Sequence, residues 1–179
     1  MKISMYAAIS VDGFLARSDG SIDWLDAIGG EGEDFGYGAF YSTVDAIVMG
    51  GKTYRTLVNA GDWGYAGKCT WVYSRKALNS GRDDVFQTNM PAPAFVEHLR
   101  SKGKQHLWVM GGGEIHSLFL REGLIDEMRL FIIPLALGEG IPLFAPPIPD
   151  MRWSLQRTKP WHGNILEMVY THTGAPTPK

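Results

Sequence analysis

The stretch VMGGGEI, residues 109–115, places three consecutive glycines between an apolar run and a predicted helix. A second turn of the same kind, IVMGGKTY, occupies residues 47–54. Glycine permits positive φ angles and lets a ligand approach the backbone closely. The helix that follows such a turn offers unpaired N–H groups and a partial positive charge. The two turns therefore favour a site for phosphate or pyrophosphate at the carboxyl ends of neighbouring strands.

Two familiar nucleotide-binding motifs do not fit these turns. A P-loop that ended in GGKT would need a glycine at Ala46, where the sequence predicts a strand. The dinucleotide fingerprint G-x-G-x-x-G fails in GGGEIH because His116 occupies its last position. The plainer alternative is that both turns are only tight connections with close helix–sheet packing. The recurrence of the pattern, with VYSR (residues 72–75) after a third strand, favours the ligand site.

Short apolar runs rich in β-branched and aromatic residues predict the strands. They occupy residues 3–10, 44–50, 69–74, 106–111, 128–134, 153–160 and 164–172. Helices are predicted over residues 53–59, 92–102 and 114–122, with Pro91 and Pro93 at a helix start and Gly103 and Gly123 at helix ends. Four runs are almost wholly apolar, as in a parallel sheet covered by helices, and the last two predict an antiparallel hairpin turning at WHGN. The sequence thus predicts an α/β fold, a three-layer sandwich with a mixed sheet.

Composition limits the classes of function. The 179 residues suffice for one compact domain, expected over residues 1–173, with a flexible tail at 174–179. A net charge of −2 gives no electrostatic case for nucleic acid or an anionic membrane. The N-terminus does not resemble a secretory signal, and no apolar run approaches the roughly 20 residues that span a bilayer. Cys69 is the only cysteine, so no internal disulfide can form, and the cytoplasm is the expected compartment.

Five motifs in a fixed order carry a resemblance to a known family. They are MYAAISVDGFLA (5–16), DAIVMGGKTY (45–54), VYSR (72–75), VMGGGEI (109–115) and LIDEMRLFIIPLALGEGIPLF (124–144). Together they resemble the dihydrofolate reductase-like superfamily, and most closely the reductase domain of bacterial riboflavin biosynthesis. The resemblance extends over residues 2–172 and is specific in its combination of motifs.

The resemblance implies a fold, a cofactor and a substrate class. It implies a mixed, mostly parallel, eight-stranded sheet with flanking helices, and a central cleft that binds NADPH and a heterocyclic small molecule. It also implies a cis peptide between Gly111 and Gly112, and a homodimer is common among relatives. The glycines would then lie against the cofactor diphosphate, where any side chain would clash.

The cofactor-binding residues are carried over from the resemblance position by position. Ala8 and Leu15 would face the nicotinamide, Leu15 at the start of a mobile loop. The glycine turns and the VYSR motif would hold the phosphates. The full set is Ala8, Leu15, Gly50, Gly51, Lys52, Thr53, Ser74, Arg75, Gly111, Gly112, Gly113, Glu114 and Ile115. Within it, Thr53 would contact the diphosphate, and Ser74 and Arg75 the adenosine 2′-phosphate, which an arginine fork suits.

The sequence departs from the family pattern at one position. Relatives usually read Met-Gly-Arg before the first glycine-turn helix, whereas here Gly51 follows Met49 and Gly50. The arginine is therefore absent, and Lys52 is the candidate to supply its charge. The preference between NADPH and NADH stays open.

The predicted catalytic acid is Asp34, which falls near the place of the family's buried carboxylate. Glu33, Asp26 and Asp23 compete for the role, because loop length varies here between relatives. If Asp34 packs against neighbouring aromatic rings, desolvation would raise its pKa toward the range useful for protonation. The five histidines show no metal-ligand spacing, so no metal is assigned.

The leading hypothesis is an NADPH-dependent reductase of a pyrimidine- or pterin-like substrate. Reduction of 5-amino-6-(5-phosphoribosylamino)uracil in riboflavin biosynthesis is its specific version. One alternative is a dihydrofolate reductase. Another, from a different class, is a nucleotide-binding module without catalysis, which steady consumption of NADPH with any substrate would exclude.

Overall fold

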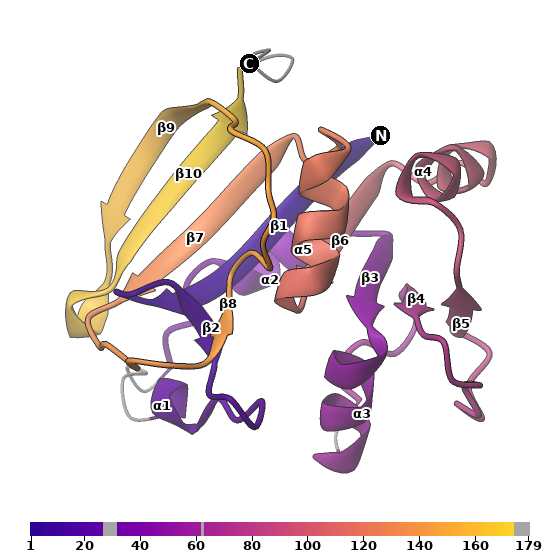
Figure 1. Cartoon of the computed structure of the whole chain (residues 1–179), viewed down its shortest axis with the longest axis horizontal. Helices are drawn as coiled ribbons and strands as arrows, with labels where there is room; N and C mark the ends of the chain where they lie inside the picture. Colours follow the sequence, from indigo (N-terminus) through magenta and orange to yellow (C-terminus); the bar gives the residue numbers. More distant parts are fainter. Residues whose placement is uncertain (27–31, 62, 174–179) are drawn as a thin grey trace.

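One mixed sheet forms the centre of the molecule (Figure 1). The structure is a computed structural model and describes residues 1–26, 32–61 and 63–173, so the predicted tail at 174–179 lies outside the described residues. The sheet has eight strands in the order β5-β4-β3-β6-β1-β7-β10-β9. Neighbours from β5 to β7 pair in parallel, and β10 pairs antiparallel with both β7 and β9. The predicted eight-stranded mixed sheet is confirmed.

Seven of the eight strands of this sheet coincide closely with the predicted apolar runs, and β5 was not predicted. The eight are β1 (Lys2–Ser10), β3 (Ala46–Gly50), β4 (Cys69–Tyr73), β5 (Val85–Thr88), β6 (His106–Gly111), β7 (Glu127–Ile133), β9 (Trp153–Pro160) and β10 (Leu166–His172). A separate two-stranded sheet joins β2 (Phe14–Ala16) to β8 (Ile141–Pro142). The predicted hairpin at the chain's end is β9–β10, which turns through the short 3₁₀ helix η1 (His162–Asn164).

Helices cover both faces of the sheet and complete the three layers. They are α1 (Asp23–Asp26), α2 (Tyr37–Thr43), α3 (Gly51–Asn59), α4 (Ala92–Ser101) and α5 (Gly113–Arg121). Buried side chains of α4 and α5 pack with the odd-numbered residues of β1, such as Ile3 and Met5. Phe40 of α2 and Tyr54 of α3 pack on the opposite face. A sheet that is covered on both sides explains why its central strands are apolar throughout.

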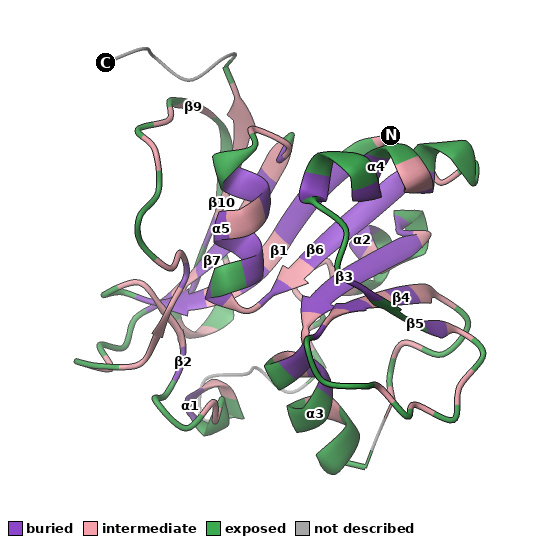
Figure 2. Cartoon of the chain, turned by 45° about the vertical axis from the view of Figure 1, so that its right-hand side comes forward, coloured by how far each residue is buried: buried purple, intermediate pink, exposed green. Residues whose placement is uncertain are grey.

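Strand β3 shows this double burial most clearly. Val48 belongs to the cluster on the α4–α5 face, whereas Ile47 and Met49 belong to the cluster on the α2–α3 face. All three side chains are fully buried. Figure 2 shows the central strands buried along their length, in contrast to the exposed edge strand β9. The central strand β3 is thus buried by side chains on both faces, and it ends at the first glycine turn.

Candidate functional site

The two glycine turns lie side by side at the carboxyl ends of β3 and β6. These strands are parallel neighbours, with Met49 opposite Gly111. The backbone N–H of Gly112 donates a hydrogen bond of 3.1 Å to the Thr53 hydroxyl. A Cβ at Gly50 would lie 3.3 Å from Ile115, so the turns also pack tightly against each other. Residues 59 positions apart in the sequence are thus brought together, as the phosphate-site prediction requires.

The three consecutive glycines are required for different reasons. Gly111 has a φ of +131°, and a Cβ there would lie 3.1 Å from the His116 ring. A Cβ on Gly113 would lie 2.3 Å from the carbonyl oxygen of Pro142, which is a collision. At Gly112, φ is −56°, and the nearest atom to a Cβ would be Thr53 Oγ1 at 3.6 Å, an ordinary contact. The protein's own packing therefore explains Gly111 and Gly113 but leaves Gly112 unexplained. The peptide between Gly111 and Gly112 is cis, as the resemblance implied.

The buried side chain of His116 packs against this turn. His116 has no exposed surface, and its Nδ1–H donates to the carbonyl oxygen of Leu143 at 3.1 Å. The carbonyl can only accept, so Nε2 carries no proton, and it has no partner among the described residues. Burial lowers the pKa of His116 to about 4, so the ring is neutral at physiological pH.

The sheet opens next to these turns. Strand β1 pairs with β6 only from Lys2 to Ser4, whereas it pairs with β7 from Ser4 to Ser10. The carboxyl-terminal halves of β1 and β6 therefore separate. In α/β sheets, ligands bind in such a crevice outside the carboxyl ends of the strands. Ala8, which the resemblance placed at the nicotinamide, lies on β1 beyond the separation point.

The VYSR motif follows β4, beside the first glycine turn. Gly50 pairs with Tyr73, which brings Ser74 next to the start of α3. The Ser74 hydroxyl donates to the Lys76 carbonyl oxygen at 2.8 Å and accepts from the Lys76 N–H at 3.2 Å. Its proton is thus already engaged in shaping the loop, so Ser74 is poorly placed to donate to the phosphate as predicted. Arg75 is exposed beside it.

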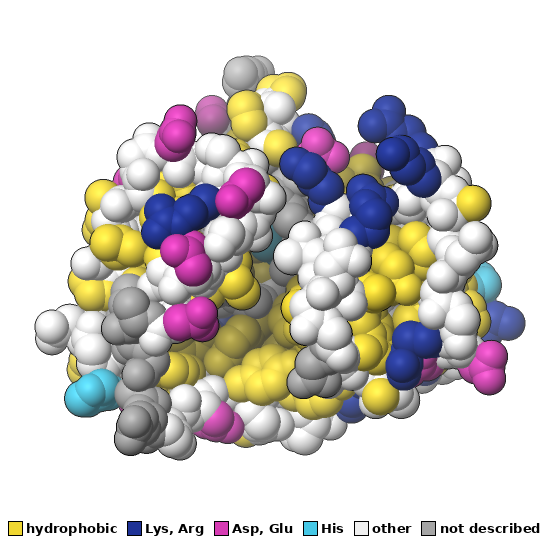
Figure 3. All heavy atoms as spheres, turned by 90° about the horizontal axis from the view of Figure 1, so that it is seen from below, with side chains coloured by type: hydrophobic (Ala, Val, Ile, Leu, Met, Phe, Trp, Pro, Cys, Tyr) yellow, Lys and Arg dark blue, Asp and Glu magenta, His cyan; other side chains and the backbone are white. Residues whose placement is uncertain are grey.

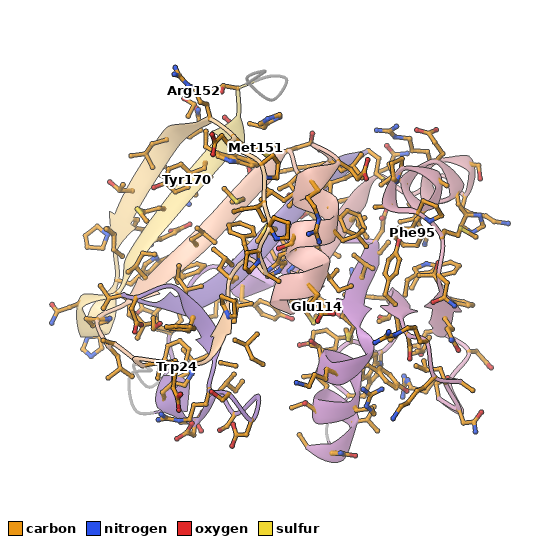
Figure 4. The ribbon with its side chains drawn as sticks, viewed as in Figure 1. Trp24, Phe95, Glu114, Met151, Arg152 and Tyr170 are labelled. Atoms are coloured by element: carbon orange, nitrogen blue, oxygen red, sulfur yellow. The ribbon has the colours of Figure 1, made fainter. Side chains whose placement is uncertain are left out.

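The remaining predicted cofactor residues surround these turns. Lys52 and Glu114 are exposed in the first turns of α3 and α5, and Figure 4 shows Glu114 at the end of α5 that meets the glycine turn. Leu15 lies in β2, partly buried against the core rather than in an open loop. Strand β2 pairs with β8, and the Pro142 carbonyl oxygen of β8 lies close to Gly113.

A pocket of about 250 Å³ opens on the other side of the separation. Figure 3 shows a hollow with an apolar floor at this end of the molecule. The lining residues come from β1, β7 and the segments around α1, α2 and β10: Tyr6, Ala8, Leu25, Asp34, Phe35, Tyr37, Phe131, Ile133 and Ile165. Such a mostly aromatic and aliphatic lining with few polar groups is typical of a site for a small organic ring. Ala8 lines the pocket and lies on the strand that borders the crevice, so it connects the two.

Asp34 is the only one of the four candidate acids that lines the pocket. Its carboxylate accepts hydrogen bonds from the N–H groups of Gly36 (2.8 Å) and Gly38 (3.0 Å). These bonds, first that of Gly36, lower the pKa of Asp34. The expected rise in pKa is therefore wrong, because Asp34 is exposed and its charge is solvated by backbone amides.

The competing acids are placed less favourably. Asp23 is paired with Arg17 at 2.7 Å on the surface, and its pKa is lowered mainly by that hydrogen bond. Asp26 is exposed, and Glu33 is half-buried outside the pocket lining. The location thus favours Asp34 for contact with a ligand, although its ionised state does not suit a proton donor.

A fully buried acid next to the pocket was missed in the sequence. Glu167 on β10 is 1% exposed and accepts hydrogen bonds from Arg157 (2.6 Å) and Trp161 Nε1 (3.0 Å). The ring of Trp161 packs edge-on against Phe35 of the pocket, with centroids 5.5 Å apart. Glu167 also pairs with Arg129 of β7 at 3.5 Å, so its partners come from both neighbouring strands and from the turn, and the strand pairing that joins them could not be foreseen from the sequence.

Comparison with known proteins identifies the family. Residues 67–162 match the model of the RibD C-terminal domain. The chain is 36% identical to the uncharacterized protein YwjB of Bacillus subtilis (strain 168), over 94% of this chain and 97% of YwjB. The chain therefore belongs to the RibD C-terminal domain family, which confirms the resemblance.

Solved structures agree with this assignment. A protein from Shewanella sp. PV-4, provisionally assigned to riboflavin biosynthesis, superposes with a TM-score of 0.90 at 28% identity, covering 97% of this chain and 100% of that one. A bifunctional diaminohydroxyphosphoribosylaminopyrimidine deaminase/5-amino-6-(5-phosphoribosylamino)uracil reductase of Thermotoga maritima shares the fold, with a TM-score of 0.73 at 14% identity. The superposition covers 96% of this chain but only 56% of that protein. Among the described residues, no helix has the length and apolar character needed to cross a membrane.

Proposed function

We propose that this protein is an NADPH-dependent reductase of a flat heterocyclic substrate. The chain belongs to a family of RibD-like reductase domains, which supports the reaction class. The observation that carries the proposal is Gly112, whose lack of a side chain has no explanation within the protein. A diphosphate lying against the backbone at this position would supply the explanation.

The residues present fit this cofactor. Gly50, Gly112 and Thr53 form a cradle between two helix N-termini, which suits the negative charge of a diphosphate. Ala8 borders the crevice between β1 and β6, where a small side chain leaves room for a ring. When bound, the cofactor supplies the hydride.

The chain's own residues hold the substrate for this transfer. Phe35 and Phe131 provide apolar surface for a ring, and the separation of β1 from β6 opens next to it. Asp34, ionised at neutral pH, is suited to accept a hydrogen bond from a ring N–H or amino group. In this proposal Asp34 positions the substrate, and proton donation is left to solvent.

The specific version is reduction of a ribosylaminopyrimidine. It is supported by the reductase activity in the printed description of the Thermotoga maritima protein. That protein also has a deaminase function, and this chain covers about half its length. A dihydrofolate-type substrate is the second candidate, favoured by the aromatic pocket with a single carboxylate. The expected homodimer and cytoplasmic location stay predictions.

Ligand-dependent stability tests the proposal. NADPH at a hundredfold excess over Kd should stabilise the native protein by about 2.7 kcal/mol and raise its thermal midpoint. NADH shares the diphosphate, so it should also stabilise the protein. It should need a higher concentration, because it lacks the 2′-phosphate. A melting curve that millimolar NADPH and NADH both leave unchanged would contradict the proposal. With the cofactor bound, oxidation of NADPH by a ribosylaminopyrimidine or by dihydrofolate then separates the two substrate classes.

A further inference from the structure

The position of the absent family arginine is already occupied. Gly51 is the buried first residue of α3, and a Cβ there would lie 3.0 Å from Ser74 Oγ and 3.2 Å from Arg55 Nη1. The Arg55 guanidinium thus sits where a side chain at position 51 would begin. From this juxtaposition we propose that Arg55 recognises the 2′-phosphate of NADPH. The inference rests on the proposed function and names a residue of the same site.

Helix geometry explains how Arg55 reaches this place. Residues four apart lie one above the other on the same helix face, and side chains lean toward the helix N-terminus. A long arginine side chain at position 55 therefore extends back over the first turn of α3. It can do so only because Gly51 presents no side chain there. A short or absent side chain at 51 and a long basic one at 55 thus form a matched pair.

The surroundings favour a dianion. Arg55, Lys52, Arg75 and Lys76 are exposed on two adjacent segments, the start of α3 and the loop after β4. None of the four forms an ion pair with a carboxylate within residues 1–26, 32–61 and 63–173. Figure 3 shows Lys and Arg side chains gathered on the half of this end that carries α3. Like charges placed together without partners repel each other, and a phosphate monoester would relieve this repulsion.

Arg55 is also better suited to the phosphate than its neighbours. The Ser74 hydroxyl proton is engaged with the Lys76 carbonyl, so it does not supply a donor. A guanidinium offers several N–H donors in a planar fork that matches phosphate oxygens, whereas Lys52 offers a single flexible charge. Discrimination of NADPH from NADH is therefore assigned mainly to Arg55, with Arg75 and Lys76 adding attraction.

The test compares Arg55→Gln with a matched control. Arg152 is exposed near the C-terminus, far from α3 in Figure 4, so Arg152→Gln removes the same charge elsewhere. Calorimetric titration would use NADPH, NADH, adenosine 2′-monophosphate and adenosine 5′-monophosphate. We expect Arg55→Gln to weaken NADPH and the 2′-monophosphate by roughly 3–10-fold, the effect of a charge-assisted hydrogen bond reduced by solvent exposure. NADH and the 5′-monophosphate should change less than about twofold, as should every ligand with Arg152→Gln, and the discrimination should shrink at high salt.

Two failures can be told apart. If the unaltered protein binds neither NADPH nor NADH, the proposed function fails and the inference falls with it. If it binds them but Arg55→Gln weakens both equally, or weakens neither, only the inference is overturned. Arg55→Lys should restore part of the lost affinity for the 2′-monophosphate if the charge acts directly on the phosphate. If Arg55→Lys binds the 2′-monophosphate as weakly as Arg55→Gln does, the inference still holds, and the planar guanidinium fork rather than the charge alone binds the phosphate. If Arg55→Lys also weakens NADH, the inference is contradicted.

Discussion

At the scale of single residues, Asp34 shows how a backbone can reverse the expected chemistry of a side chain. Its aromatic neighbours in the sequence indicated desolvation and a raised pKa. The structure instead directs the Gly36 and Gly38 amides at the carboxylate and lowers that pKa. A group that is ionised in this way can anchor a ligand N–H but holds no proton to donate at neutral pH.

Substitution of Asp34 by asparagine tests the anchoring role. Asn keeps one acceptor oxygen for the turn amides but removes the charge, so we expect the fold to persist. Turnover at low substrate concentration, measured as kcat/KM, should fall roughly tenfold to a hundredfold, as for loss of a charge-assisted hydrogen bond. Affinity for NADPH should stay unchanged.

The pH dependence of kcat/KM in the unaltered protein distinguishes an anchoring carboxylate from a general acid. Because the pKa of Asp34 lies below its ordinary value of 3.8, an anchoring carboxylate is present above that pH, and its activity is lost only as the pH falls below it. A general acid would instead lose activity as the pH rises through its pKa. An acidic-side optimum that disappears in Asp34→Asn would therefore contradict the anchoring role.

His116 predicts a second, independent pH effect on stability. Its pKa is about 4 in the folded protein and 6.5 when exposed, so protonation favours the unfolded chain. Its stabilising contribution is complete above pH 6.5 and is lost progressively as the pH falls toward 4. Between pH 7 and pH 5 the free energy of unfolding should fall by about 2 kcal/mol on this account.

Urea unfolding at both pH values measures this effect. His116→Gln should lack that part of the fall, whereas His162→Gln, at an exposed position of the β9–β10 turn, should keep it. Equal pH dependence in all three proteins would show that His116 does not titrate on unfolding.

At the scale of elements, the turn between β6 and α5 contains two glycines that differ in how closely the protein packs around them. Gly113 approaches the Pro142 carbonyl at the β8 strand and cannot carry a side chain without displacing it. Gly112 has room for a methyl group toward the protein and an ordinary φ. The turn thus contains one glycine that is needed for the close packing of β8 on α5 and another that the protein's own packing does not require.

Alanine at these two positions should have opposite consequences. Gly112→Ala should leave the free energy of unfolding unchanged or raise it by up to about 1 kcal/mol. NADPH affinity should fall by roughly tenfold or more, as overpacking costs about 1–3 kcal/mol. Gly113→Ala should lower the free energy of unfolding by about 1–3 kcal/mol. Calorimetry and urea unfolding measure both, and normal binding by a folded Gly112→Ala protein would show that its glycine serves no ligand.

Much of the architecture could be predicted at this scale, because apolar periodicity reports burial directly. The seven runs that became β1, β3, β4, β6, β7, β9 and β10 are examples. Strand β5 was missed because VFQT has only two buried residues and lies on an edge. Helix α2, YGAFYST, was also not predicted, because its glycine and its β-branched and hydroxyl residues have low helical propensity. The packing of Phe40 in the core stabilises this helix instead.

At the scale of the whole molecule, the predicted cofactor residues gather, but the pocket could not be foreseen. Motif order placed both glycine turns and VYSR, which the parallel register of β3, β4 and β6 brings to one edge. The pocket instead combines single side chains from distant segments, such as Tyr6, Phe131 and Ile165. Nothing in the sequence reports which alternate residues of β1 face α2, or that Arg55 lies over Gly51.

The short ladder between β1 and β6 divides the sheet into two four-stranded plates, which are joined by only three residue pairs. One plate, β5-β4-β3-β6, carries the glycine turns, and the other, β1-β7-β10-β9, carries most of the pocket. In the proposed function, the distance from cofactor to substrate would depend on the angle at which the two plates meet. A buried hydrogen bond of 2.9 Å between His106 Nε2 and Ser4 Oγ lies at that joint. In the proposed function, the width of the cleft would therefore depend on a His106–Ser4 contact that belongs neither to the pocket lining nor to the glycine turns.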